Sequence, residues 1–95
     1  MGDRITTTRK GIAFDLDVKF LWELWQKQNK LCAISGIRLN IDENASLDRI
    51  DSSKGYTKDN VQWVHKDINK MKMDLPIDEF LTYCNIISNF NKKEV

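Results

Sequence analysis

The first clear hydrophobic periodicity of the chain is helical and begins after Asp17. Asp17 suits the N-cap position, because its carboxylate can accept a backbone N–H of the first turn. Phe20 and Leu24 widen an apolar stripe whose main members recur at i, i+3, i+4 and i+7, namely Val18, Leu21, Trp22 and Trp25. This spacing predicts a helix over residues 18–30 with one face toward the core.

Short alternating segments follow and predict strands. The stretch ASLDRID (residues 45–51) alternates apolar and polar positions, and NVQWV (residues 60–64) does the same after the polar loop SSKGYTKD. In the earlier stretch LCAISGIRLNID, the Ser35-Gly36 pair lies between two apolar pairs. That arrangement indicates a strand, a turn and a second strand.

Two further helices are predicted in the second half of the chain. The stretch HKDINKMKMD (residues 65–74) has helical spacing, and it ends before Pro76 because proline disfavours α geometry at the preceding residue. A last helix covers IDEFLTYCNIISNF (residues 77–90). Residues 1–11 are polar and cationic, which indicates an arm or a short edge strand. The order of helix, strands, loop, strand, helix and helix predicts a single α+β domain in which a two-stranded hairpin leads into a short helix.

The composition of the chain excludes some classes of protein but does not identify a function. The 95 residues are 41% hydrophobic and 31% charged, which is typical of one globular domain. Fifteen basic and fourteen acidic residues leave a net charge of +1, so any basic surface must be local.

Cys32 and Cys84 form no CxxC motif, which argues against a disulfide framework and against a structural zinc site. No apolar run approaches the roughly 20 residues of a membrane span, and no signal peptide is recognisable, so we expect a cytoplasmic protein.

One pair of polar side chains could carry chemistry. Asp48 ends the first predicted strand of the hairpin, and Asn69 lies on the helix that follows the second. Because a hairpin folds back on itself, the two side chains can meet where it joins the helix. One carboxylate and one neutral oxygen suit Mg²⁺, which keeps positions open for water and phosphate and stabilises charge on a scissile phosphate. An Asp at a strand end and an Asn in a helix are common, so a purely structural role fits this pair at least as well.

The segment Ala45 to Lys72 closely resembles the HNH, or ββα-metal, nuclease motif of phage and bacterial endonucleases. Asp48 stands at the place of the acidic metal ligand, Asn60 at that of the middle Asn, and Asn69 at that of the final metal ligand. The stretch around C-A-I-S-G and the last helix resemble the same family more loosely. The resemblance implies a single-metal endonuclease domain that uses Mg²⁺ or Mn²⁺ to hydrolyse phosphodiester bonds in DNA, in a bacterial or phage-infected cell.

The chain departs from the family where the general base is expected. Arg49 replaces the usual histidine, and arginine stays protonated in proteins, so it can bind a phosphate but cannot accept the proton. The base is then Asp51, His65 or a hydroxide already bound to the metal. Asp51 lies on the same strand face as Arg49 and is slightly preferred. His65 is the one imidazole of the chain, but a supporting role behind the metal ligands or a capping role suits its position at least as well. Some relatives carry D-R-I-D as their ordinary form, so Arg49 alone does not make the chain inactive.

The second departure is the absence of the paired CxxC motifs that hold zinc in many relatives. We expect aromatic packing in place of that zinc, by Trp22, Trp25, Trp63 and Phe80. Asn60 is expected to bond backbone groups across the loop, and Gly55 to supply a positive-φ turn there.

Five lysines make the motif locally basic, although the whole chain is almost neutral. A solvated face is the ordinary role of such a cluster, but next to a phosphate-cleaving site these side chains become candidate contacts to the DNA backbone. They are Lys54, Lys58, Lys66, Lys70 and Lys72.

A second class of function competes with the nuclease. The chain could be a nuclease-derived DNA-binding or interaction module that no longer cuts, with Arg49 as the inactivating change. A purely structural α+β domain is a weaker third interpretation. The sequence also leaves open a homodimer, or a partner protein that supplies sequence specificity.

Overall fold

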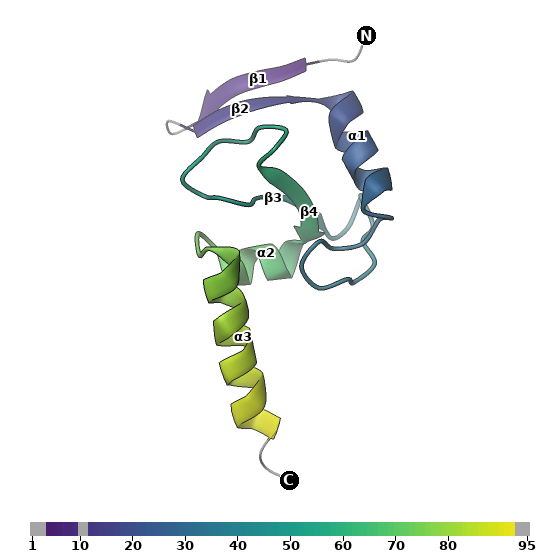
Figure 1. Ribbon diagram of the computed structural model, residues 1–95. Helices are drawn as coiled ribbons and strands as arrows, with labels where there is room; N and C mark the ends of the chain where they lie inside the picture. The colour runs from purple at the N-terminus through teal and green to yellow at the C-terminus, as the bar shows by residue number, and fades with distance from the viewer. Residues whose placement is uncertain (1–3, 10–11, 93–95) are drawn as a thin grey trace.

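The computed structural model describes residues 4–9 and 12–92 of the chain and confirms the α+β class (Figure 1). Three helices accompany an antiparallel two-stranded hairpin that leads directly into a helix. The elements are β1 (Arg4–Arg9), β2 (Ile12–Asp17), α1 (Val18–Lys27), β3 (Ala45–Arg49), β4 (Val61–His65), α2 (Lys66–Lys72) and α3 (Ile77–Lys92).

An additional hairpin forms where the sequence indicated a polar arm. β1 pairs antiparallel with β2 from Arg4–Asp17 to Arg9–Ile12, so residues 4–9 are a strand, as one of the two expectations had it. The rest of the predicted arm, residues 1–3 and 10–11, lies outside the described part of the chain. β2 was not predicted, although its sequence IAFDLD alternates in hydrophobicity as a half-buried strand does.

The first helix begins as its capping residue predicts. Asp17 is the N-cap of α1, and its Oδ1 accepts the backbone N–H of Phe20 at 2.7 Å. The helix ends at Lys27 rather than at residue 30. Asn29 and Lys30 adopt positive φ values of 55° and 61°, which no α-helix can accommodate.

The core gathers around one face of α1 and the β3–β4 hairpin. Its buried cluster consists of Trp25, Cys32, Leu39 and Val64. The rings of Trp25 and Trp63 meet edge to face, with centroids 5.5 Å apart and planes at 80°. Phe80 is also buried, but Trp22 is 54% exposed. Three of the four expected aromatic residues are therefore wholly or partly buried, and the predicted stripe of α1 faces the core only in part.

Side-chain amides tie the end of α1 to β4. Gln28 donates from Nε2 to the carbonyl of Trp63 and accepts the N–H of Trp63 on Oε1, both at 2.9 Å. The indole N–H of Trp63 donates to the carbonyl of Leu21 at 3.0 Å. These bonds give the backbone N–H and C=O of Trp63 hydrogen-bond partners and hold the hairpin at a fixed position on the helix.

The segment between α1 and β3 contains a turn but no pair of strands. In place of two paired strands it has one isolated antiparallel β-bridge, between Leu31 and Arg38. Gly36 has a φ of 75° in the turn between them. The prediction of a turn near Ser35-Gly36 is confirmed, and the prediction of two flanking strands is wrong.

The last helix extends away from the body of the molecule (Figure 1). Phe80, near its start, is its buried residue, and it begins directly after Pro76, as predicted. Among the described residues, no helix combines the length and the apolarity needed to cross a membrane.

Candidate metal and nucleic-acid site

Asp48 and Asn69 line one open pocket of about 710 Å³ between β3, the following loop and α2. Asp48 comes from β3 and Asn69 from α2, so the hairpin and the helix bring together the two side chains that the sequence paired. Arg49, Lys66, Lys70 and Asp74 also line this pocket. It therefore combines acidic, amide and cationic groups in one concave surface.

The carboxylate of Asp48 is held by two donors. The β3–β4 register places Asp48 opposite Gln62, whose Nε2 donates to Asp48 Oδ2 at 3.0 Å. The ammonium group of Lys72 donates to Asp48 Oδ1 at 3.2 Å. Asp48 is only 4% exposed and Lys72 is 0% exposed, so the two form a buried ion pair at the edge of the pocket.

This burial corrects the expectation that Lys72 belongs to an exposed lysine face. The last turn of α2 lies against β3, where the side chain of Lys72 also approaches the carbonyl of Arg49 at 3.4 Å. A buried ammonium group requires such partners, because burial without them is costly. Lys72 is therefore placed to hold Asp48 and not to contact a DNA backbone.

Asn69 lines the pocket from α2. Its Nδ2 donates to Ser46 Oγ at 2.7 Å, which fixes the amide orientation and leaves Oδ1 as the atom that could ligate a cation. A carboxylate has about four acceptor positions, so the two donors on Asp48 do not exhaust it. The described residues contain no group of three or more His, Cys, Asp or Glu side chains that could hold a metal ion. One carboxylate and one amide oxygen are the hard donors that Mg²⁺ takes, and most of its shell would then have to come from water and phosphate.

Arg49 lines the pocket and also braces the loop. Its Nη1 donates to the carbonyls of Ser52 at 2.9 Å and Lys54 at 3.0 Å, and its guanidinium lies 5.4 Å from the centre of the Tyr56 ring. A guanidinium carries five N–H donors, so donors remain for a phosphate.

The two candidate bases lie elsewhere. Asp51 Oδ1 accepts the hydroxyl of Ser53 at 2.6 Å and the backbone N–H of Ser53 at 2.9 Å, which lowers the pKa of Asp51 below its ordinary value.

His65 caps α2, with Nδ1 accepting the N–H of Asp67 at 3.1 Å. His65 pairs with Ala45, three positions from Asp48, so the alternation of the strand puts it on the opposite face. Neither Asp51 nor His65 lines the pocket. The capping role considered for His65 is confirmed.

Asp74 is the acidic side chain of this pocket that the sequence interpretation missed. The hydroxyl of Ser52 donates to the Asp74 carbonyl at 3.0 Å and ties this residue to the hairpin loop. The signal for Asp74 in the sequence is its place two residues beyond the helix that carries Asn69, in the Asp74-Leu75-Pro76 run that ends this helix.

Asn60 braces the loop as predicted. Its Oδ1 accepts the N–H of Asp51 at 2.8 Å, and its Nδ2 donates to the carbonyls of Asp51 at 3.0 Å and Gly55 at 2.8 Å. Asn60 is 5% exposed. The positive φ expected at Gly55 is wrong, because Gly36 is the glycine with positive φ in the described part of the chain. Gly55 contributes its carbonyl instead.

Replacing Asn60 with alanine is expected to lower the free energy of unfolding by about 2–3 kcal/mol. The change removes three hydrogen bonds and leaves partly buried backbone groups of Asp51 and Gly55 without their partner. Urea denaturation followed by circular dichroism measures the loss. Asn85→Ala, at an exposed position of α3, is the control and should change stability by less than about 0.5 kcal/mol. Equal effects of the two variants would contradict the bracing role.

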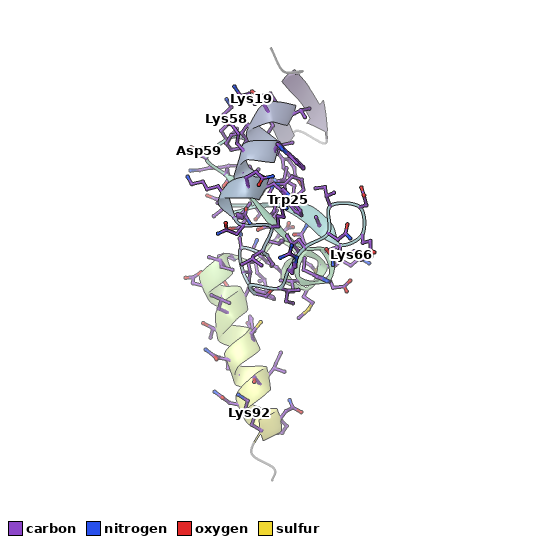
Figure 2. All side chains as sticks on the ribbon, turned by 90° about the vertical axis from the view of Figure 1, so that its right-hand side faces the viewer. Lys19, Trp25, Lys58, Asp59, Lys66 and Lys92 are labelled. Atoms are coloured by element: carbon purple, nitrogen blue, oxygen red, sulfur yellow. The ribbon has the colours of Figure 1, made fainter. Side chains whose placement is uncertain are left out.

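The remaining lysines lie at different places around the hairpin. Lys66 and Lys70 are exposed and line the pocket, whereas Lys54 is exposed on the loop outside it. Lys58 instead approaches α1, 3.6 Å from Asp17 Oδ2 and 5.6 Å from the centre of the Phe20 ring. Figure 2 shows Lys58 beside α1 and Lys66 farther down the body. The basic rim of the pocket is therefore formed by Lys66, Lys70 and Arg49.

Comparisons of the chain with protein-family models, with curated proteins and with solved structures gave no match in any of the three. The geometry of the pocket and the sequence motif are thus what bear on function.

Proposed function

We propose that the chain is a metal-dependent endonuclease of the HNH type that hydrolyses phosphodiester bonds in DNA. One observation carries the proposal: Asp48 and Asn69, at the motif's two ligand positions, line the same pocket. The ββα order of β3, β4 and α2 supports it, because that order places the hairpin and the helix around the pocket.

The pocket residues divide the work of this reaction. Asp48 and Asn69 would hold the Mg²⁺ or Mn²⁺, which supplies stabilisation of the charge that develops on the phosphate. Lys66 and Lys70 contact backbone phosphates without reading sequence, and Arg49 binds a phosphate with its remaining donors. The loop braced by Asn60 keeps Arg49 at the pocket.

The direct test is incubation of the purified chain with supercoiled plasmid and MgCl₂ or MnCl₂. We expect conversion to open-circular or linear DNA, and none when the divalent ion is chelated. Absence of cleavage with both ions would refute the proposed activity. Cleavage that survives Asn69→Ala and Asp48→Asn together would refute the proposed site.

Asp74 is our candidate for the group that accepts the proton of the attacking water, because Asp74 lines the pocket and neither Asp51 nor His65 does. Asp74→Asn is expected to lower the nicking rate by about 100-fold or more. Asp51→Asn and His65→Gln should retain most of the wild-type rate in the same assay. A large loss in either of these two, with Asp74→Asn active, would return the role to the earlier candidates.

A second function is favoured by two observations. The ion pair of Asp48 with Lys72 and the arginine at position 49 both suit a DNA-binding module that no longer cuts. Such a module would retain DNA with an affinity that falls steeply with salt, and it would show no cleavage with either ion. A gain of cleavage in Arg49→His, from an inactive parent, would favour this alternative.

A further inference from the structure

Lys72 is the fully buried lysine of the described chain, and its charge is directed at a candidate metal ligand. Its ammonium group lies 3.2 Å from Asp48 Oδ1 and 3.4 Å from the carbonyl of Arg49. Lysine is rarely buried in proteins unless it is paired. This pairing joins the last turn of α2 to β3, directly beside the pocket.

The position of Lys72 on α2 places its ammonium group close to where a divalent cation would bind. Asn69 lies three positions earlier on the same helix, so the two side chains share a face. A divalent cation held by Asp48 and Asn69 would approach the carboxylate that the ammonium already contacts. The divalent cation and the Lys72 ammonium would then share one carboxylate, and two positive charges that close repel strongly where burial keeps water away.

We infer that Lys72 is the resident counter-cation of this site: its ammonium balances Asp48 in the metal-free protein and competes with a divalent cation for the Asp48 carboxylate. The inference rests on the proposed metal site. It assigns Lys72 a positioning role, because Lys72 acts through Asp48, and it makes the affinity for the cation depend on this lysine.

Lys72→Met tests the inference, because methionine keeps the apolar length of the side chain and removes the charge. Without divalent ions, the uncompensated carboxylate should lower the melting midpoint by more than about 10 °C. In a titration with MnCl₂ followed by thermal melting, the variant should bind Mn²⁺ at least about tenfold more tightly than the wild type. Lys19→Met, an exposed lysine of α1 outside the pocket, is the control and should change the melting midpoint and the Mn²⁺ affinity little.

The outcomes separate the inference from the metal site on which it rests. A Mn²⁺-induced shift that is present in the wild type, lost in Asp48→Asn and not strengthened in Lys72→Met would overturn the inference and leave the metal site standing. No shift in any of these proteins would overturn both. A merely structural lysine would lower the midpoint without changing the Mn²⁺ affinity.

The test remains decisive if Lys72→Met is unfolded without metal. Circular dichroism should then show refolding as MnCl₂ is added, which supports the competition. If no refolding occurs, the titration is repeated with Lys72→Gln, which is neutral but retains hydrogen-bond donors. Tighter Mn²⁺ binding by Lys72→Gln than by the wild type supports the inference, and equal or weaker binding overturns it.

Discussion

Asp48→Asn is expected to reduce plasmid nicking by at least about 100-fold, because it removes the pocket carboxylate that we propose as the metal ligand. Asparagine preserves the shape of the side chain and an acceptor for Lys72. The variant therefore removes the negative charge while it disturbs the packing of the hairpin as little as the site allows. The assay is the rate at which supercoiled plasmid disappears in the presence of MnCl₂.

The double variant Asp48→Asn with Lys72→Met separates a lost site from a lost fold. It removes both members of the buried ion pair, so neither charge remains without compensation, and its stability should exceed that of Lys72→Met alone. Its nicking should remain absent. If Asp48→Asn stays folded and nicks at the wild-type rate, Asp48 is not a metal ligand.

Trp25→Ala is expected to lower the free energy of unfolding by about 3–5 kcal/mol. That is a large part of the roughly 5–15 kcal/mol by which a domain is stable. Trp25 is 3% exposed, belongs to the core cluster and packs edge to face on Trp63, so its removal opens a cavity where α1 meets β4. Urea denaturation followed by far-ultraviolet circular dichroism measures the loss.

Trp22→Ala is the matched control for that prediction, because it makes the same chemical change one turn earlier in α1, where the side chain is exposed. Its cost should stay within about 1 kcal/mol. Equal losses at the two positions would mean that α1 presents a different face to the core.

The features that the sequence predicted correctly depend on neighbouring residues. Asp17 caps α1 because its carboxylate reaches an N–H three residues later. Asn60 bonds backbone groups within nine positions of itself. The hairpin followed by a helix is also encoded locally, by alternation in ASLDR and VQWVH and by helical spacing after them. Likewise, the shared pocket of Asp48 and Asn69 follows once the hairpin folds back.

The features that escaped prediction depend on which distant segment covers each residue. Trp22 and Trp25 belong to the same periodic stripe, and the segments that pack on Trp25, namely β4 and the loop with Cys32 and Leu39, decide which of the two is buried. Lysine is usually a surface residue, but the carboxylate of Asp48, 24 positions earlier, accounts for the burial of Lys72. The periodicity of α2 cannot reveal that partner.

The pairing register explains why His65 does not line the pocket. Once Asp48 is known to pair with Gln62, strand alternation puts His65 on the other face, but the register itself is not readable from either strand alone. The outward position of Asp51 follows from its bonds to Ser53, and both residues lie in the irregular loop after β3. The same loop approaches Asp74 through Ser52, a contact that no local pattern predicts.

A crystal structure of the chain soaked in MnCl₂ would show whether the pocket binds a metal, because Mn²⁺ can be located by its anomalous scattering. We expect an anomalous peak in the pocket, at coordination distance from the Asp48 carboxylate and the Asn69 amide oxygen, with the Lys72 ammonium moved away from Asp48 Oδ1. A pocket without a peak, or a peak whose ligands include neither Asp48 nor Asn69, would contradict this expectation.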